Sequence, residues 1–392
     1  MHPLYLFAPE NDMALAFGGK YYTPTPIAQT IARDLSLLPV WYATEADAQV
    51  LSVQTIDNEM QQHLDALGIT AQVTASPSHH TTRCVPWGWS AYIVDKLQRA
   101  GINGNILPDD KQISLLRQLS SRATTCTIIE ALSNHSAGYT LPPTPQILRN
   151  DNEVKQYIES YPATILKAPW SSSGRGVWAV SNGYDTSTQR YASGIIRKQG
   201  YIMGEVLQEK IIDLAMEFES NGKEVKFAGY SLFTTDSRGA YQGNLLASNE
   251  YIEQQLSQYI DTTHLHNTRR AMEHITSTLI APHYQGHFGI DMILYRNSKS
   301  NILLHPCIEL NLRMSMGMVA RTIADRFLSP ASIGTYHVDY HPDSTQIIKQ
   351  HHTLQHAHPL HINNHRITSG YLPLTPIHNN THYTAYIVVE EL

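Results

Sequence analysis

Apolar residues along the first hundred positions alternate between short runs, typical of buried strands, and longer stretches with helical spacing. The runs at residues 4–7 and 40–43 predict strands, and the spacing over residues 27–37 predicts a helix between them. The stretch 90–101 begins with a serine that can cap a helix, carries an apolar stripe and ends at a glycine. This alternation predicts a doubly wound α/β layer over residues 1–107.

The middle of the chain contains more strand-like runs. A helix is expected soon after residue 110, followed by a turn rich in proline and glycine at residues 138–145. A second helix is expected at 153–161, and a third in an acidic stretch at 249–260. The predicted strands lie at residues 165–167, 177–180, 202–206, 215–218, 226–233, 286–295, 302–313 and 383–389.

The last sixty residues contain an unusual density of histidine. Two interpretations of these histidines are a zinc site and a solvated loop. The spacing matches no metal-ligand pattern, no cysteine lies nearby and the run is rich in proline and asparagine, which favours the loop. The histidines are His351, His352, His356, His358, His361 and His365.

Composition narrows the class of protein. A chain of 392 residues with 42% hydrophobic and 9% aromatic residues is expected to fold into two to four globular subdomains. A net charge of −6 gives no electrostatic footprint for nucleic acid or an anionic membrane. No apolar run reaches the roughly 20 residues that span a bilayer, the first residues lack a signal-peptide pattern, and three widely spaced cysteines argue against a disulfide framework. We therefore expect a soluble cytoplasmic protein.

The first candidate for chemistry is a lysine that ends an apolar run and precedes a loop of small residues. Lys167 is followed by three serines and two glycines, and a second apolar run begins at Val177. Such a strand–loop–strand can wrap backbone N–H groups around polyphosphate while the lysine supplies positive charge. The order differs from a Walker-type loop, because the lysine comes before the glycines.

The second candidate is the predicted hairpin formed by residues 286–295 and 302–313. Asp291 lies on its first strand, and Glu309, Asn311 and Arg313 alternate along the second, so their side chains share one face. Two carboxylates and an amide oxygen are ligands that Mg²⁺ accepts when it also binds substrate phosphates. The alternatives are a solvent-facing polar edge for the whole set and a structural salt bridge for Arg313.

These segments resemble the ATP-grasp superfamily, whose members join a carboxylate to an amine through an acyl phosphate. The resemblance covers roughly residues 105–325. It implies two basic residues at the phosphates, a lid similar to that of formate-dependent glycinamide ribonucleotide transformylase, an adenine-binding hinge and a ribose-binding acid. The residues so implied are Lys111 and Lys167, the lid Ser171, Ser172, Ser173, Gly174, Arg175 and Gly176, the hinge Glu209, Lys210, Ile211 and Ile212, and the acid Glu217.

The second strand of the hairpin is similar to the metal strand of D-alanine ligases and biotin carboxylase. The resemblance implies Mg²⁺ ligands at Asp291, Glu309 and Asn311, and an arginine, Arg313, at the acyl phosphate. One departure is Gly289, which stands where the ligases carry an arginine two residues before the first metal acid. Arg313 is the candidate to replace that arginine.

The resemblance implies an α/β protein in which a doubly wound pre-ATP-grasp domain precedes a two-lobed α+β ATP-grasp module and a short C-terminal extension. The expected units are 1–107, 108–200 with the lysine strand and lid, 201–330 with the metal site, and 331–392. The implied reaction is ATP- and Mg²⁺-dependent joining of a small carboxylate to an amine, with ADP and phosphate released and with Lys167 and Arg313 catalytic. A small-molecule kinase and a non-catalytic nucleotide-binding protein remain alternatives.

Three further segments have less specific signals. The loop 10–12 follows the first strand, where ligands gather in α/β sheets, although a helix cap explains it equally well. The segment 87–89 places two tryptophans around a glycine and is better explained as a packed corner than as a pocket floor. Residues 241–244 are a candidate loop beside the acceptor substrate. The sequence identifies neither substrate nor the oligomeric state.

Overall fold

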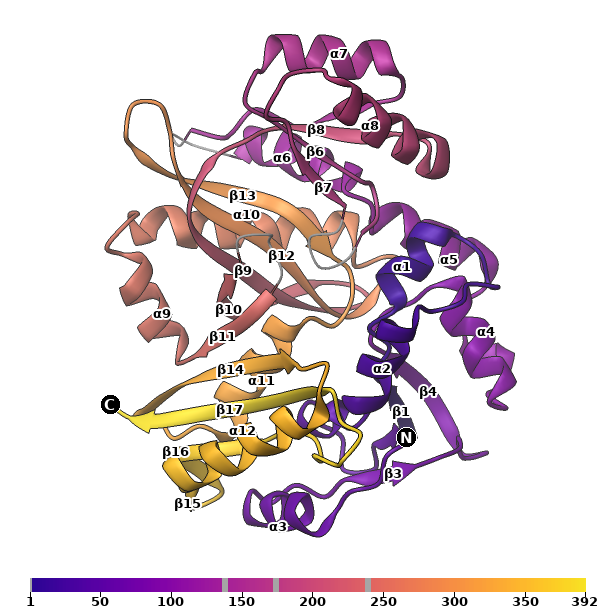
Figure 1. Ribbon diagram of the computed structural model, residues 1–392, viewed down its shortest axis with the longest axis vertical. Coiled ribbons are helices and arrows are strands. Elements are labelled where there is room, and N and C mark those ends of the chain that lie inside the picture. Colours follow the sequence, from indigo (N-terminus) through magenta and orange to yellow (C-terminus); the bar gives the residue numbers. More distant parts are fainter. Residues whose placement is uncertain (1, 136–139, 172–175, 237–240) are drawn as a thin grey trace.

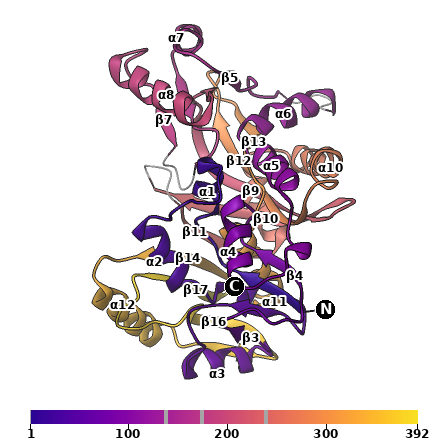
Figure 2. The ribbon, with the colours of Figure 1, turned by 90° about the vertical axis from the view of Figure 1, so that its right-hand side faces the viewer.

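Three β-sheets organise the computed structural model (Figure 1), two of four strands and one of nine. In the views of Figures 1 and 2, one four-stranded sheet lies above the nine-stranded sheet, and the N-terminal sheet lies below and beside it. The α/β class predicted from the sequence is confirmed. The structure describes residues 2–135, 140–171, 176–236 and 241–392.

The N-terminal unit is a parallel sheet with strand order β3-β2-β1-β4. Because parallel neighbours need crossover connections, helices lie between β1 and β2 and between β2 and β3, whereas residues 75–80 join β3 to β4 without a helix. Its strands are β1 (His2–Leu6), β2 (Gln49–Leu51), β3 (Gln72–Thr74) and β4 (Thr81–Pro86), and its helices are α1 (Asn11–Phe17), α2 (Pro26–Asp34), α3 (Asn58–Ala66) and α4 (Ala91–Arg99). The predicted N-cap is confirmed, since the Ser90 hydroxyl accepts from Ile93 N at 3.4 Å.

One predicted strand in this unit was wrong. Residues 40–43 belong instead to the 3₁₀-helix η1 (Leu38–Trp41) and the turn after it. The run Leu37 to Tyr42 is buried along its whole length, and a short apolar run without alternation does not distinguish a strand from a helical turn. Trp41 is fully buried and donates its indole N–H to Leu374 O at 2.6 Å, which ties the turn to the C-terminal part of the chain.

The upper lobe in Figure 1 is the second four-stranded sheet, with order β5-β8-β6-β7, and two helices pack on it. Its core includes Leu148, Val154, Leu166 and Ile202, all less than 5% exposed. The elements are β5 (Gln146–Leu148), α7 (Asp151–Ser160), β6 (Thr164–Lys167), β7 (Val177–Ala179), α8 (Thr186–Gln199) and β8 (Ile202–Val206). Two helices lead into this lobe, α5 (Asp110–Leu119) and α6 (Ala123–His135), after the short 3₁₀-helix η2 (Gly104–Ile106).

The nine-stranded sheet has the order β13-β12-β9-β10-β11-β14-β17-β16-β15. Residues 331–392 continue this sheet, because β14 pairs with β11 on one side and β17 on the other. Its strands are β9 (Glu209–Asn221), β10 (Val225–Thr235), β11 (Tyr241–Leu246), β12 (Gln285–Arg296), β13 (Ile302–Asn311), β14 (Ser332–Tyr340), β15 (His361–Asn363), β16 (Arg366–Pro373) and β17 (Tyr383–Glu391). Its helices are α9 (Asn249–Leu256), α10 (Thr262–Leu279), α11 (Met316–Phe327) and α12 (Ser344–Ala357).

The prediction of a solvated loop for the histidine-rich segment was wrong. Residues 344–357 form helix α12, with Ile347 and His351 on its buried side. His351 Nδ1 lies 3.0 Å from the Tyr371 hydroxyl on β16, and its Nε2 lies 3.6 Å from Glu59 on α3. His351 is therefore part of the face on which α12 packs. The number of polar residues in the segment did not predict this, because it does not show which of them are buried.

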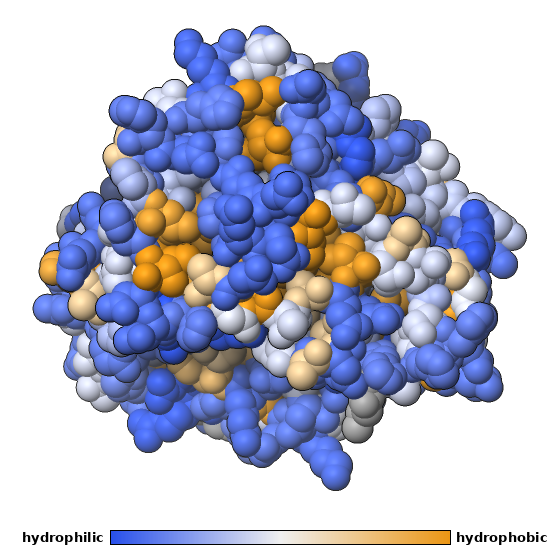
Figure 3. Space-filling model, turned by 90° about the horizontal axis from the view of Figure 1, so that it is seen from below, coloured by the Kyte–Doolittle hydropathy of each residue, from blue (hydrophilic) through white to orange (hydrophobic). Residues whose placement is uncertain are grey.

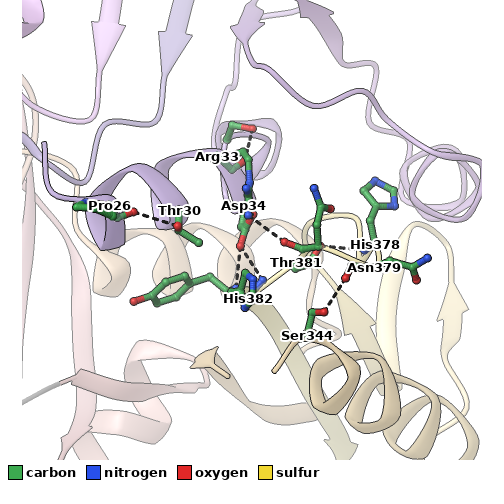
Figure 4. A network of polar contacts seen from close by, with 12 residues as sticks. Pro26, Thr30, Arg33, Asp34, Ser344, His378, Asn379, Thr381 and His382 are labelled. Atoms are coloured by element: carbon green, nitrogen blue, oxygen red, sulfur yellow. Dashed lines mark hydrogen bonds and ion pairs between the residues drawn. The ribbon is translucent and has the colours of Figure 1, made fainter. Parts of the chain in front are cut away.

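The first and last parts of the chain are joined by a buried acid at the end of α2 (Figure 4). Asp34 is 1% exposed and accepts hydrogen bonds from the backbone N–H groups of His382 and Tyr383 at 2.8 and 3.0 Å. Arg33 Nε donates to the other oxygen at 2.8 Å, and its guanidinium reaches Asn380 O at 2.9 Å. Each oxygen of this buried carboxylate accepts a hydrogen bond, so Asp34 holds the end of α2 against the start of β17.

Across the described ranges, no helix combines the length and the apolar character needed to cross a bilayer. The face in Figure 3 is mostly hydrophilic, with separate apolar areas between charged and polar side chains. Large apolar side chains that are exposed lie at scattered positions, which is normal for a folded surface. They are Phe17, Tyr21, Ile27, Val53, Leu207, Tyr259, Tyr340 and Leu392.

Candidate active site

A single buried guanidinium joins the lysine strand, the start of the lid and the metal strand. Arg122, just before α6, is 5% exposed and donates from Nη1 to Ala168 O at 2.6 Å and to Ser171 Oγ at 2.7 Å. Its Nη2 donates to Glu309 Oε2 at 2.8 Å. The Nε of Arg122 is buried and has no partner among the described residues. Arg122 therefore marks the place where the two lobes meet, and the sequence analysis missed it.

Lys111, which the resemblance suggested as the first basic residue, lies elsewhere. It is exposed in the first turn of α5, one helix earlier than Arg122. Asp109 caps this helix with a capping box to Gln112, so the sequence around Lys111 is explained by helix initiation. A signal for Arg122 was present in the sequence, since a serine and an arginine directly precede a second apolar helix.

Lys167 lies at the end of β6, as predicted, but its side chain is paired and buried. It is 6% exposed, and its Nζ lies 2.5 Å from Glu205 Oε2 on the neighbouring strand β8. The other oxygen of Glu205 is buried without a partner among the described residues. On β13, burial and then the charge of Lys167 lower the pKa of His305 to about 3, so this imidazole is neutral. The site therefore contains two cations at its base, Lys167 and Arg122.

The two strands that flank the predicted lid lie where the sequence predicted them, with β6 ending at Lys167 and β7 beginning at Val177. Lys167 pairs with Val177 across β6 and β7, and Ala168 N donates to Gly176 O at 2.7 Å at the base of the loop. Gly176 has no room for a side chain, since a Cβ there would lie 2.3 Å from Ser171 Cβ. The lid residues Ser172, Ser173, Gly174 and Arg175 lie outside the described residues.

The predicted metal hairpin is confirmed as an antiparallel pair. Asp291 on β12 faces Glu309 on β13, and Gly289 faces Asn311. Burial, followed by repulsion from Glu309, raises the pKa of Asp291 to about 7, while a hydrogen bond with the Asn311 side chain opposes that rise. Two carboxylates with an amide form an oxygen donor set that suits Mg²⁺ if substrate oxygens complete the shell. No group of three or more His, Cys, Asp or Glu arranged for a metal occurs in the described residues.

Glu217 lies on β9, beside this hairpin and opposite Gly289 of β12, and it is almost completely enclosed. It is 1% exposed, and the Ser315 hydroxyl lies 3.1 Å from Oε2 and 3.2 Å from Oε1. A Cβ at Gly289 would lie 2.6 Å from one Glu217 oxygen, and a Cβ at Gly317 would lie 2.3 Å from the other. Gly289, which departs from the family pattern, thus leaves space for this carboxylate.

The burial of Glu217 bears on the role that the resemblance implied for it. Desolvation first, and then the charge of Asp291, raise the pKa of Glu217 to about 8. A carboxyl that is 1% exposed presents almost no surface to a ribose. The ribose contact that the resemblance implied for Glu217 stays a prediction.

The predicted hinge lies at the crossing between the lobes. The chain leaves the upper sheet at the end of β8, Val206, and enters the nine-stranded sheet at the start of β9, Glu209. Residues 209–212 are therefore the first residues of a long strand, and Glu209 is an exposed partner of Arg296 at 3.4 Å. Leu207, 42% exposed, projects from the crossing itself. Further along β9, Asp213 holds Lys210 at 2.6 Å.

Arg313 lies just past β13 and uses all three of its nitrogen atoms. Nη2 donates to Asn311 Oδ1 at 3.0 Å, Nη1 donates to Met314 O at 3.0 Å, and Nε donates to Asp12 Oδ1 at 2.7 Å. The pKa of Arg313 is raised, because attraction to Asp12 and the other nearby acids outweighs the effect of burial. The strand was predicted to run to residue 313 but ends at Asn311, and Arg313 contacts both Asn311 and Asp12 of the N-terminal unit.

Two of the three less specific segments, residues 87–89 and 241–244, have clear structural roles. Trp87 is 4% exposed and packs edge-to-face on Phe7, with ring centroids 4.9 Å apart, which confirms a packed corner. Asn244, in the candidate acceptor segment, is 3% exposed on β11 and donates to Ser231 Oγ at 2.5 Å. Its amide therefore belongs to a buried polar network of the large sheet.

Comparison with solved structures identifies the fold. Biotin carboxylase from Campylobacter jejuni matches with a TM-score of 0.51 and 10% identity, covering 100% of this chain and 87% of that one. The biotin carboxylase domain of Hydrogenobacter thermophilus 2-oxoglutarate carboxylase matches with a TM-score of 0.50 and 12% identity, covering 99% and 85%. N5-carboxyaminoimidazole synthetase from Staphylococcus aureus matches with a TM-score of 0.50 and 11% identity, covering 100% and 93%.

Sequence comparison adds nothing to this assignment. No family model matches the chain, and no curated protein matches it. At 10–12% identity the structural likeness establishes the architecture alone. The likeness covers 99–100% of this chain, and the chain has the fold of these enzymes, the ATP-grasp fold.

Proposed function

We propose that this protein is an ATP-dependent ligase that activates a small carboxylate as an acyl phosphate and transfers it to an amine. The observation that carries the proposal is the contact of the buried cation Arg122 with Glu309 of the β12–β13 hairpin and with Ser171, at the end of the strand segment that carries the second buried cation, Lys167. Arg122 contacts the lid and Glu309 at once, at 2.7 and 2.8 Å. Cations suit the phosphates of a nucleotide, and the neighbouring acids suit the metal that accompanies it.

In this proposal the nucleotide lies at the junction of the lobes. Arg122 and Lys167 hold the phosphates, with the lid, Ser171 to Gly176, above them. The adenine lies at the crossing after β8, where Leu207 is exposed and residues 209–212 begin β9. Asp213 directly follows residues 209–212 on β9, and its side chain is 14% exposed. It replaces the enclosed Glu217 as the candidate for the ribose.

Asp291, Glu309 and Asn311 are the residues that would hold Mg²⁺. The metal would neutralise charge on the transferring phosphoryl group, a reaction that depends mostly on positioning and electrostatics. The fit rests on the donor set, since the Asp291 and Glu309 strands pair directly and Asn311 hydrogen-bonds Asp291. Arg122 keeps Glu309 oriented toward the site through its 2.8 Å hydrogen bond.

Arg313 is the candidate group for the carboxylate substrate and the acyl phosphate. Its planar fork can give two parallel hydrogen bonds to a carboxylate. In the reaction a carboxylate oxygen attacks the γ-phosphorus and ADP leaves. The amine then attacks the acyl carbon and phosphate leaves with the carboxylate's oxygen. An acceptor that arrives as an ammonium gives one proton to that phosphate and one to solvent, and no covalent enzyme intermediate is required.

The structural neighbours support the proposal by analogy. The Campylobacter jejuni enzyme is described in complex with an ATP species, and the Hydrogenobacter thermophilus domain with MgADP and bicarbonate. Each of these two structures combines a carboxylating enzyme with a bound nucleotide. For this chain we propose the same cofactors, ATP and Mg²⁺.

The test is a screen of carboxylates and amines for ADP release, with the new product identified by mass spectrometry. An ¹⁸O-labelled carboxylate gives the decisive result, because acyl phosphate chemistry transfers one labelled oxygen to the released phosphate. A kinase would form ADP without free phosphate, and a binding protein would form no ADP with any pair. Either outcome rejects the ligase.

A further inference from the structure

A narrow cavity lies between α1 of the N-terminal unit and the metal strand β13. Asn11, Asp12 and Leu15 form one wall, Trp170 and Ser171 form another, and residues 309–313 form the third. The nucleotide contacts proposed above use the lobe side of this strand. The α1 wall has no role in the ligase reaction as described so far.

The α1 wall offers hydrogen-bond acceptors. Asn11 is 1% exposed, and its side-chain oxygen is buried with no partner among the described residues. Asp12, 15% exposed, uses Oδ1 for Arg313, and the described residues supply no hydrogen bond to its second oxygen. A buried acceptor without a donor costs free energy, which a ligand carrying N–H groups would recover.

The corner after β4 is shaped around these groups. A Cβ at Gly88 would lie 2.4 Å from Asn11 Nδ2 and 3.0 Å from Arg313 Cβ. The first contact is closer than packed atoms allow, so a side chain at residue 88 would displace the Asn11 amide, and the second is tight. The position of Asn11 is therefore supported by a second segment of the N-terminal unit.

We propose that Asn11 and Asp12 bind the ammonium group of the acceptor substrate, which makes the acceptor a cationic amine. This inference rests on the proposed ligase function. Arg313 contacts Asp12 at 2.7 Å and Asn311 at 3.0 Å, so one guanidinium separates the ammonium site from the metal strand. A carboxylate held by Arg313 and an ammonium held by Asp12 would lie side by side, in the arrangement that amide formation needs.

The charges favour a cation over an anion on this wall. Asp12 and Glu309 both line the cavity, and the acceptor oxygen of Asn11 adds to the negative potential. An anionic acceptor would meet these oxygens, and Arg313 is already assigned to the carboxylate substrate. Leu15 and Trp170 line the same cavity and provide an apolar surface for the carbon atoms beside the amine.

The experiment compares two nucleophiles that differ in charge. Hydroxylamine is uncharged at neutral pH and traps an acyl phosphate as a hydroxamate without an ammonium site. The second nucleophile is the amine that gives the fastest amide formation in the screen described above. Asp12→Asn should lower the ratio of amide to hydroxamate at least tenfold, and Asn11→Ala should lower it in the same direction. Asp65→Asn, an exposed acid on α3, is the matched control and should leave the ratio unchanged.

The outcomes separate the two proposals. If wild-type protein forms no hydroxamate with ATP and any carboxylate, the ligase function fails. If hydroxamate forms but no cationic amine is ever joined, or if Asp12→Asn lowers both products equally, the ammonium site is wrong and Asp12 only positions Arg313. If Asp12→Asn does not fold, Asn11→Ala decides by the same ratio.

Discussion

The guanidinium of Arg122 and the carboxylate of Glu309 form a hydrogen-bonded ion pair of 2.8 Å between residues that are 187 positions apart in the sequence. Arg122 is 6% exposed in its side chain and Glu309 is 26% exposed. The arginine is thus fixed inside the protein, and the carboxylate keeps a free side toward the cavity. Any metal held by Glu309 would share that carboxylate with Arg122. The proposed phosphate site and the proposed metal site are therefore linked through one side chain.

The first prediction concerns Arg122. Arg122→Lys keeps the charge, but one ammonium cannot reach Ala168, Ser171 and Glu309 together. We expect ATP affinity to fall at least about tenfold, which is about 1.4 kcal/mol. Isothermal titration measures it, and Arg99→Lys on α4, whose side chain is 68% exposed, is the control. Unchanged affinity in Arg122→Lys would remove this residue from the phosphate site.

The second prediction concerns the buried pair of Lys167 and Glu205. Removing one partner of such a pair leaves an uncompensated charge, so Lys167→Met should destabilise the fold by about 3–5 kcal/mol. This differs from the view that the sequence alone suggested, in which Lys167 is free to point at phosphate. The double variant Lys167→Met/Glu205→Gln should regain most of the stability, measured by urea unfolding, and remain inactive. Recovery of activity in the double variant would show that Lys167 has only a structural role.

The third prediction separates binding from chemistry at the metal strand. Glu309→Gln keeps the volume and can still accept from Arg122, but it weakens the ligand set for Mg²⁺. We expect kcat to fall about 10²–10³-fold, the scale found when a catalytic charge-stabilising group is removed. ATP affinity should change much less. A loss in kcat below about threefold, which is under 1 kcal/mol, would place Glu309 outside the metal shell.

The fourth prediction follows from the raised pKa of Glu217, about 8. The folded state retains a proton that the unfolded chain releases near its ordinary pKa of about 4.3. Stability from this group is therefore fully present at low pH and is lost as pH rises from about 4 to about 8. Glu217→Gln, measured by thermal unfolding in EDTA, should lose less stability over this window than the wild type. Parallel pH profiles for the two proteins would contradict the burial of an ionisable group there.

The sequence predicted best where the contacts are local. The β12–β13 hairpin is joined by a short turn, and its alternating acids face one another in register, with Asp291 opposite Glu309. The cap at Ser90 is equally local. In these cases the spacing of side chains along one or two neighbouring elements decides the structure, and a single sequence contains that spacing.

The features that the sequence did not show depend on distant partners. Arg122 finds its acceptors 46, 49 and 187 positions away, so the residues beside it in the sequence do not show these contacts. Glu217 is enclosed because Gly289 and Gly317 lack side chains, which only the packed sheet shows. The buried side of α12 depends on Tyr371 of another strand. Tertiary packing overrode composition in each case.

The last prediction concerns Arg313, for which a structural and a catalytic role predict different measurements. Its three nitrogens hold Asp12, Met314 O and Asn311 at 2.7–3.0 Å, and a lysine cannot replace all three. If Arg313 stabilises the acyl phosphate, Arg313→Lys should leave ATP affinity nearly unchanged and lower carboxylate-dependent ADP formation at least about tenfold, or 1.4 kcal/mol of barrier. If Arg313 serves only as a clamp between β13 and α1, the same variant should lower the melting temperature and keep the rate. The Asp12 contact makes some loss of stability certain, so the rate decides between the roles. Thermal unfolding and single-turnover ADP formation, measured on one preparation, give both quantities, and a rate within threefold of the wild type would assign Arg313 to the clamp.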